Sequence, residues 1–273
     1  MDGSIIVSGL VFPEGPVWLD GDLVVTEIEA GALSRWSPDG GLRRIADVGG
    51  GPNGATLGPD GALYVTQNGG MFRAGRVTPG ILRVQPDDGS WELVVTEVAG
   101  LSLEGPNDLA FGPDGRLYFT DPRGSADPAH NDRPGRLFAV DLDTMDGELV
   151  AEVGPVFPNG IAFTADGTLL WTESFSRRVM QRGADGRPEV VIELPARHAP
   201  DGMCVGADGA LYVASTYAHC VSVVRDGEIV DRLMCGDGMV TNCCFGGTDL
   251  YVTDSRRGNL YRFPLGVEGL PLH

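Results

Sequence analysis

The sequence predicts an all-β protein, a six-bladed β-propeller with four-stranded blades, formed by a single domain that covers residues 1–273. Three observations lead to this prediction. A pattern of residues recurs six times along the chain, each copy contains hairpin-like pairs of short apolar runs, and the last copy lacks a strand that is left over at the N-terminus. Units of about 40–50 residues with four short strands each are typical of propeller blades.

Each copy of the repeat opens with a polar residue beside proline, glycine or threonine. A short apolar run follows, then in most copies an Asp-Gly pair, and then a second apolar run. The opening polar residues are spaced 39 to 54 residues apart, and they are Glu14, Asn53, Asn107, Asn159, Asp201 and Asn242. This spacing matches one blade per copy.

Hairpins account for the strands within a copy. In the fourth copy, apolar runs at 161–163 and 169–172 flank Asp166-Gly167, a pair that supplies the positive φ of a tight hairpin turn. A second hairpin follows the first, as shown by the runs at 136–140 and 149–152 of the third copy. Two hairpins per copy predict four strands per blade.

The sixth copy contains only three candidate strands, at residues 242–245, 250–253 and 259–263. The segment Ile5-Ile6-Val7 precedes the first copy and has no partner there. Pairing of this N-terminal strand with the last blade would close the ring and remove two open sheet edges. We therefore expect the N-terminal strand to complete blade six.

The repeat also predicts which loops lie together. Because strands alternate in direction, the opening polar residues and the loops between second and third strands share one face, and the Asp-Gly turns occupy the other. The two longest connections, residues 67–79 and 121–134, fall on the first face. Long loops on one face of a rigid scaffold commonly carry function.

Composition excludes several classes of protein. There are 38 acidic and 20 basic residues, a net charge of -18, which argues against nucleic acid and anionic membranes as partners. All the basic residues are arginine, so neither a Walker phosphate loop nor a lysine Schiff base is possible. No apolar run approaches the roughly 18 residues of a membrane span, and no signal peptide is recognisable.

A cytoplasmic protein is therefore expected, with its five cysteines as buried free thiols. The sequence carries no indication of oligomeric state.

The opening polar residues predict a metal site. The innermost strand of each blade lines the channel of a propeller, so these residues form a ring at one mouth. All six are oxygen donors, which suits one hard divalent cation, with Ca²⁺ favoured and Mg²⁺, Mn²⁺, Zn²⁺ or Fe²⁺ as alternatives. Any single Asn-Gly is equally well explained by a turn in which the asparagine bonds its own backbone. Six donors at one repeat position favour the cation.

Five motifs resemble the gluconolactonase / senescence-marker-protein / luciferin-regenerating-enzyme family: FPEGP at 12–16, GPNDLAF at 105–111, FPNG at 157–160, PDGM at 200–203 and TNCCFGG at 241–247. The family includes lactone hydrolases and is related to diisopropyl fluorophosphatase and paraoxonase. The resemblance implies a six-bladed propeller with one divalent metal in its channel. By motif, it makes Glu14, Asn159 and Asp201 the core metal ligands, Asn107 a further ligand or a substrate contact, and Asp201 the base.

One position departs from the family pattern. The sugar lactonases of the family resemble one another in having an arginine two residues before the equivalent of Asn107, where this chain has Gly105. Gluconolactone itself is therefore disfavoured as the substrate. The candidate substrate-binding residues are Asn53, Asn107, Asp121 and Arg123. Arg123 either replaces the missing arginine or is an ordinary surface residue.

The expected function is a metal-dependent hydrolase that opens a small lactone or related ester. The cation would polarise the carbonyl group, and Asp201 would accept a proton from the attacking water. Alternatively, water bound to the cation attacks and Asp201 is only a ligand. Two further alternatives are a phosphorus-ester hydrolase that uses the same metal site and a propeller that binds partners without turnover.

Overall fold

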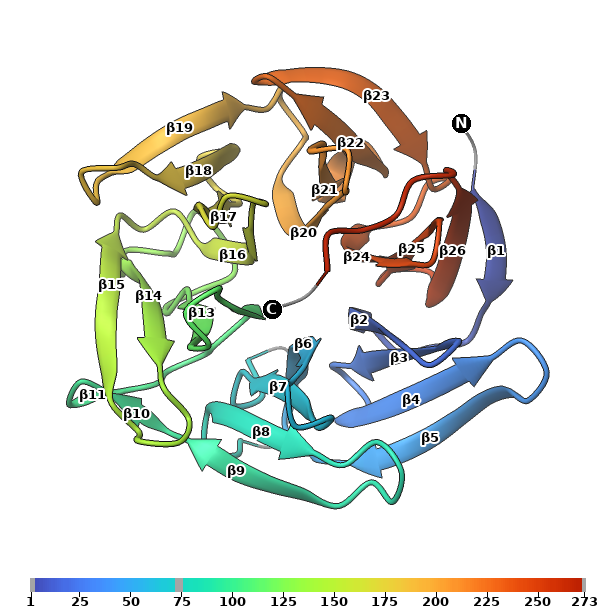
Figure 1. Cartoon of the computed structure of the whole chain (residues 1–273), viewed down its shortest axis with the longest axis horizontal. Coiled ribbons are helices and arrows are strands. Elements are labelled where there is room, and N and C mark those ends of the chain that lie inside the picture. Colours follow the sequence, from blue (N-terminus) through green and yellow to red (C-terminus); the bar gives the residue numbers. More distant parts are fainter. Residues whose placement is uncertain (1–2, 72–75, 272–273) are drawn as a thin grey trace.

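Six four-stranded antiparallel sheets surround a central axis in the computed structural model, which describes residues 3–71 and 76–271 (Figure 1). The predicted all-β propeller is confirmed. In every blade the strand nearest the axis comes first in the sequence pattern, and the outermost strand lies at the rim.

The strands of the first three blades are as follows: β2 (Pro13–Leu19), β3 (Asp22–Glu27), β4 (Ala32–Ser37) and β5 (Gly41–Asp47) in blade one; β6 (Pro52–Leu57), β7 (Leu63–Gln67), β8 (Gly80–Val84) and β9 (Trp91–Val95) in blade two; β12 (Leu109–Phe111), β13 (Leu117–Asp121), β14 (Gly135–Val140) and β15 (Gly147–Val153) in blade three.

The strands of the last three blades are β16 (Pro158–Phe163), β17 (Leu169–Glu173), β18 (Arg178–Arg182) and β19 (Pro188–Glu193) in blade four; β20 (Pro200–Val205), β21 (Leu211–Ser215), β22 (Cys220–Arg225) and β23 (Glu228–Met234) in blade five; and β24 (Val240–Gly246), β25 (Asp249–Asp254), β26 (Asn259–Pro264) and β1 (Ser4–Val7) in blade six.

Blade six is completed by the N-terminal strand, as predicted. Strand β1 pairs antiparallel with β26, and Val7 lies opposite Leu260 in the register. Val7 is buried in a cluster with Leu10, Leu23 and Leu260, so the closing strand adds apolar contacts as well as backbone hydrogen bonds. The ring is therefore held shut by residues from the two ends of the chain.

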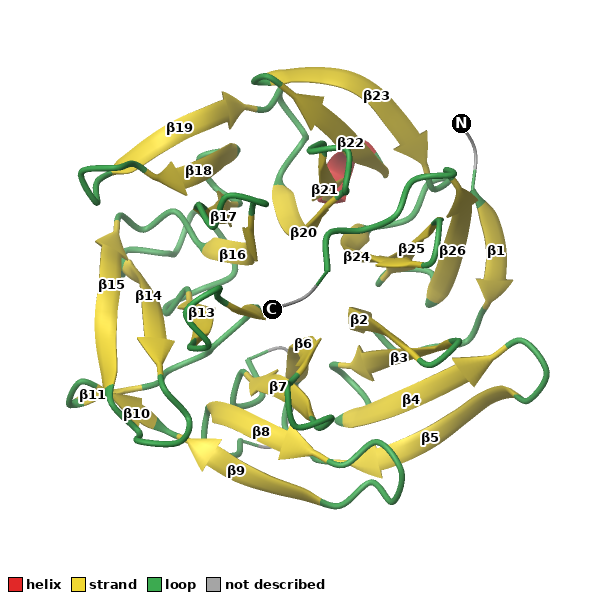
Figure 2. Cartoon of the chain, viewed as in Figure 1, coloured by secondary structure: helices red, strands yellow, loops and turns green. Residues whose placement is uncertain are grey.

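Two short elements were not anticipated. A two-stranded hairpin, β10 (Glu97–Val98) and β11 (Leu101–Ser102), connects blade two to blade three, turning through Ala99 and Gly100, which both have positive φ. A single 3-10 turn, η1 (Thr216–Ala218), follows β21 (Figure 2). Across residues 3–71 and 76–271, no helix has the length and apolar character needed to cross a membrane.

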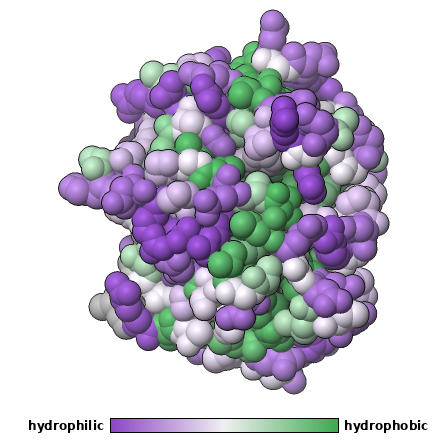
Figure 3. Space-filling view, turned by 90° about the vertical axis from the view of Figure 1, so that its left-hand side faces the viewer, coloured by the Kyte–Doolittle hydropathy of each residue, from purple (hydrophilic) through white to green (hydrophobic). Residues whose placement is uncertain are grey.

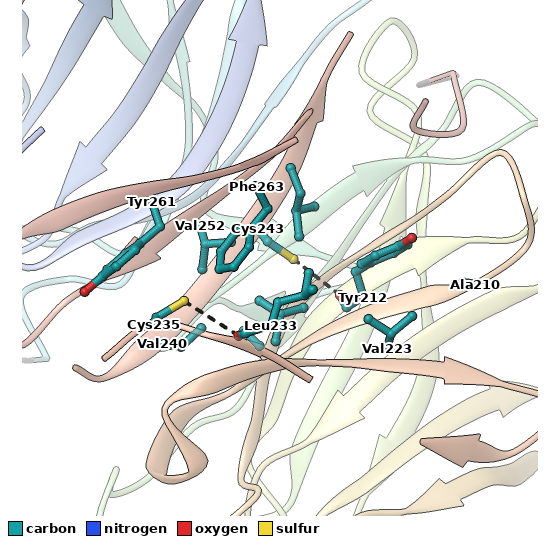
Figure 4. Packing of buried hydrophobic residues seen from close by; sticks show 13 residues of the cluster. Ala210, Tyr212, Val223, Leu233, Cys235, Val240, Cys243, Val252, Tyr261 and Phe263 are labelled. Carbon is teal, nitrogen blue, oxygen red and sulfur yellow. Dashed lines mark hydrogen bonds between the residues drawn. The ribbon is translucent and has the colours of Figure 1, made fainter. Parts of the chain in front are cut away.

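The hydrophobic core consists of separate clusters between neighbouring blades. Between blades five and six, Tyr212 and Leu233 pack against Val252 and Phe263 (Figure 4). The Cys243 thiol lies in the same cluster, 3.3 Å from the carbonyl oxygen of Tyr212. All five cysteines are free thiols, as predicted, although Cys204 and Cys244 are only partly buried.

The outermost strands present both charged and apolar side chains at the surface. On the side of the ring formed by blades three and four, hydrophilic residues predominate and a broken band of hydrophobic residues runs between them (Figure 3). Leu149 on β15 and Val190 on β19 are among the exposed apolar residues, at 37% and 52% exposure.

A buried threonine hydroxyl links each of the first four blades to the next. Thr26, Thr66, Thr120 and Thr172 occupy the same place on the second strands of blades one to four. Their hydroxyls donate to the backbone carbonyls of the opening polar residues of the following blades: Asn53 at 2.5 Å, Asn107 at 2.5 Å, Asn159 at 2.7 Å and Asp201 at 2.7 Å. These bonds fix the position of each innermost strand relative to its neighbour.

Blade five has Ala214 at the threonine position and so has no hydroxyl to donate. At the closure of the ring, the Ser255 hydroxyl of blade six donates to the Pro13 carbonyl of blade one at 2.8 Å. The threonine near the end of the second strand therefore has a structural role between blades in blades one to four.

The buried side of β1 leads to a stability prediction. Val7→Ala should lower the free energy of unfolding by about 2 kcal/mol, because it leaves a gap in a closed apolar cluster. Ile5→Ala is the matched control on the same strand, where the side chain is 52% exposed, and should cost less than about 0.5 kcal/mol. Urea unfolding of both variants measures the difference. Equal losses would show that β1 does not pack into blade six as described.

Candidate functional site

The central channel contains two chambers, one behind the other along the innermost strands. The first, here called the ring chamber, has a volume of about 320 Å³ and is lined by five of the opening polar residues: Glu14, Asn53, Asn107, Asn159 and Asp201. The second, the tail chamber, has a volume of about 310 Å³ and is lined by later residues of the same strands and by residues 269–271 near the C-terminus. The C-terminal segment approaches the channel axis (Figure 1).

Strand irregularities aim the opening polar residues into the channel. In blades one, two, four and five the innermost strand begins with proline and the polar residue comes next. The pairing with the second strand shifts register at or across the polar residue in each of these blades. Such bulges redirect side chains. Since Asn53 and Asn159 lie in strands, the alternative that they are turn residues is wrong.

The glycines that follow the polar residues allow the innermost strands to approach one another. A Cβ atom on Gly54 would lie 2.3 Å from the Asp108 carboxylate, and one on Gly160 would lie 2.5 Å from the Asp201 carbonyl. Neither glycine has an unusual φ, so the requirement is space alone. The glycines of these two Asn-Gly pairs are therefore needed so that the innermost strands can lie close together.

Blade six departs from the pattern. Thr241 takes its place in the wall of the ring chamber, whereas Asn242 lines the tail chamber. The Asn242 side-chain carbonyl accepts a hydrogen bond from the Cys243 amide at 2.8 Å. The ring chamber therefore has five of the six predicted donors.

Three buried acids share the centre of the channel. Burial raises the pKa of Glu14 to about 7, although hydrogen bonds from the Gly15 amide, Asn242 and Thr241 oppose the shift. Burial and the Glu14 charge raise the pKa of Asp108 to about 8. Burial, Glu14 and Asp108 raise the pKa of Asp201 well above its ordinary value. No arginine in the described part of the chain forms an ion pair with any of the three.

Asp108 was missed by the sequence analysis. It lines the tail chamber and directly follows Asn107. The corresponding residues of blades one, two, four and five are glycines, so a lone aspartate at a glycine position was the available signal.

Asp121 lies outside the walls of both chambers. It is fully buried, and it accepts backbone hydrogen bonds from Gly105 at 2.8 Å and from Glu104. Glu27 and Gln67, at the ends of the equivalent strands, accept backbone hydrogen bonds from Val11 and Gly51 in the same manner. These side chains hold the segments that lead into the innermost strands. The structure thus places Asp121 as a support of the loop before Asn107.

Arg123 also lies outside the ring chamber. Its guanidinium donates to Glu104 at 2.8 Å and to the Pro134 carbonyl at 3.2 Å, and the residue is 8% exposed. Arg133 binds the same glutamate. Arg123 therefore has neither of the two expected roles. It does not replace the missing arginine in the chamber, and it is not an ordinary surface residue, because it is held by Glu104.

The donors of the ring chamber fit a hard cation. Glu14 and Asp201 supply carboxylate oxygens, and Asn53, Asn107 and Asn159 supply amide oxygens. The Asn159 amide nitrogen donates to Ser174 at 3.2 Å, which leaves its oxygen for other partners. Over residues 3–71 and 76–271, His, Cys, Asp and Glu form no metal-binding group of three or more, so a cation here would depend on amides as well as carboxylates.

Comparisons with known proteins agree with this architecture. The family model described as "SMP-30/Gluconolactonase/LRE-like region" matches residues 12–256. A gluconolactonase from Zymomonas mobilis is 28% identical, over 92% of this chain and 78% of its own length. The pentonolactonase XacC of Haloferax volcanii is 31% identical, over 88% of this chain and 80% of its own.

Among solved structures, the calcium-binding protein regucalcin from Agrobacterium tumefaciens superposes with a TM-score of 0.79 at 17% identity, covering 100% of this chain and 97% of its own. This similarity shows the shared fold. The family model spans most of the chain and includes the segments that carry all five donors of the ring chamber. The chain therefore belongs to the SMP-30/gluconolactonase/LRE-like family.

Proposed function

We propose that the protein is a divalent-metal-dependent hydrolase that opens a small lactone. The observation that carries the proposal is the set of buried acids in the channel, with Glu14 and Asp201 on the ring chamber and Asp108 behind them. Burial raises all three pKa values, and repulsion from neighbouring carboxylates adds to the shifts of Asp108 and Asp201. A bound cation would offset both the burial of these carboxylates and the repulsion between them. Similarity to a gluconolactonase and a pentonolactonase supports lactones as the substrate class.

Glu14, Asn159 and Asp201 would hold the cation, with Asn107 as a further ligand or a substrate contact. When bound, the cation would polarise the lactone carbonyl and stabilise negative charge on its oxygen. Asp201 is the base of the reaction. The Thr216 hydroxyl donates to its carboxylate at 3.3 Å and orients it.

In the reaction, water adds to the lactone carbonyl carbon as Asp201 accepts one of its protons. The ring C–O bond then breaks, and the former ring oxygen takes up a proton. The product is a hydroxy acid. Asn53, whose side chain also lines the ring chamber, is positioned to contact the lactone ring.

A propeller that only binds partners has no use for such a cluster. Buried like charges without paired cations destabilise the folded protein. Carboxylates near the surface of the described part of the chain are instead paired with arginines, as Asp208 is with Arg225. The unpaired acids in the channel instead favour a chemical role.

The proposed base can be tested by removing its charge. Asp201→Asn should reduce lactone kcat by at least about a thousandfold while the thermal unfolding temperature changes little, because the side chain keeps its shape. Asp208→Asn is the matched control in the same blade, exposed at the far end of the hairpin, and should keep nearly full activity. A pH-stat assay of acid release measures both. Near-normal turnover by Asp201→Asn would exclude this residue as the base.

Cation binding should depend on pH. The pKa of Glu14 is about 7 in the folded protein against an ordinary 4.5, so the folded state retains a proton that the unfolded state has lost. The metal-free protein therefore loses stability as pH rises from about 4.5 to 7, and a cation restores it by pairing with the carboxylate. Cation affinity should rise about tenfold per pH unit for each proton displaced.

Calorimetric unfolding with and without saturating Ca²⁺ tests this dependence. We expect a larger rise in unfolding temperature at pH 8 than at pH 5, and almost none at either pH in Glu14→Gln. A rise that is equal at both pH values, or that persists in Glu14→Gln, would contradict the assignment of Glu14 as a ligand.

A further inference from the structure

Beside the donors, the wall of the ring chamber includes a group of apolar side chains. Its side chains come from the segments before the innermost strands and from the loops between second and third strands. We call this set the apolar collar: Phe12, Ile28, Phe157, Phe175, Ala199 and Met239. The rings of Phe157 and Phe175 pack 5.1 Å apart, so this part of the wall is continuous.

The sequence positions that contribute Phe12, Phe157 and Ala199 to the collar are apolar in every blade. The residues two places before the opening polar residues are, in blade order, Phe12, Gly51, Gly105, Phe157, Ala199 and Val240. None of them has a polar side chain. At Gly105, a Cβ atom would lie 2.7 Å from the terminal methyl group of Met71, so an apolar side chain occupies the space that a larger residue there would need.

Four polar side chains near the collar are already bonded within the protein, whereas Arg197 and Tyr217, which also line the chamber, are largely exposed to solvent. The Ser174 hydroxyl donates to the Pro200 carbonyl at 2.7 Å, and the Thr216 hydroxyl donates to Asp201. The Thr241 hydroxyl contacts Ser255 at 2.7 Å, and Arg177 binds Glu193 at 3.2 Å. A sugar hydroxyl buried against the apolar collar would therefore lose its water without gaining a partner among these four side chains.

From this wall we infer that the preferred substrate is a lactone with a hydrocarbon substituent, not a polyhydroxylated sugar lactone. The inference rests on the proposed function. The lactone ring faces the carboxylate and amide oxygens, and the substituent lies against the apolar collar, where Phe175 is half-buried and open to contact. The cavity of about 320 Å³ is in the range of small-ligand sites.

Two sets of five-membered lactones test the inference on the intact protein with its cation. The first carries unbranched alkyl chains of one to six carbons on the ring, and the second is a pentono-1,4-lactone. We expect kcat/KM to rise about fourfold per methylene until the chamber is filled. The longest alkyl lactones should exceed the pentono-1,4-lactone by about a hundredfold or more. A flat series, or equal or faster hydrolysis of the pentono-1,4-lactone, would overturn the inference and leave the hydrolase proposal standing.

Variants of Phe175 show whether the collar causes the preference. Phe175→Ala should reduce the gain per methylene, whereas Phe175→Leu should largely retain it, because leucine replaces most of the apolar surface. The thermal unfolding temperature of each variant reports on folding. An unchanged gain per methylene in folded Phe175→Ala would contradict contact between this side chain and the substituent.

Binding of the corresponding lactams separates this inference from the proposed function, since lactams resist hydrolysis. Calorimetric titration should give tighter binding of the hexyl lactam than of the hydroxylated lactam. If no lactone is hydrolysed but this order of binding holds, the hydrolase proposal fails and the preference for an apolar cyclic ligand stands. If the hydroxylated lactam binds equally well or better, the inference fails whether or not turnover is observed.

Discussion

The hydrogen bond from a second-strand threonine to the next blade's innermost strand positions four of the five donors of the ring chamber. Thr26, Thr66, Thr120 and Thr172 each bind the backbone carbonyl of a residue whose side chain faces the channel. Each bond contributes on the order of 1 kcal/mol, but its geometric effect is larger. Because the same backbone atom of blades two to five is held by the preceding blade, four donors that are distant in sequence are brought to one level around the axis.

Convergence of the strands brings buried carboxylates together, and this unfavourable arrangement is relieved either by protonation or by a bound cation. Placing Glu14, Asp108 and Asp201 in one water-poor channel raises all three pKa values. Ion pairs between arginines and carboxylates are abundant near the surface of the protein, where water solvates both charges. The channel, in contrast, concentrates acids and amides. A divalent cation suits this distribution of charge, and a substrate that lies against the apolar collar would displace water and so strengthen electrostatic effects on its carbonyl.

The sequence predicts the propeller well because its signals are local and repeated. Asp-Gly turns, alternating apolar runs and a spare strand at residues 5–7 each specify structure within one blade, and the repeat multiplies them. The level of Glu14, Asn53, Asn107, Asn159 and Asp201 follows from the same periodicity. Asn242 breaks it because a register shift between Val240 and Asn242 turns Thr241 into the chamber.

What the sequence does not predict depends on contacts between segments. Asp121 ends a strand near the channel mouth, but only the fold shows that it faces the Gly105 amide. Arg123 meets Glu104 through a long loop with no repeat to guide the prediction. Asp108 was not predicted because the repeat assigns the channel position of this blade to its neighbour Asn107. The apolar collar likewise arises from residues of several loops whose proximity follows from ring closure.

We propose that the channel binds one divalent cation through Glu14, Asp201 and the neighbouring amides. Elemental analysis after equilibrium dialysis against Ca²⁺, Mg²⁺, Mn²⁺, Zn²⁺ and Fe²⁺ in turn tests it most directly, with the double variant Glu14→Gln/Asp201→Asn measured in parallel. We expect one tightly retained ion per chain in the native protein for at least one of these cations, and none in the folded double variant. Absence of any bound cation in the native protein, or equal retention by the double variant, would contradict it.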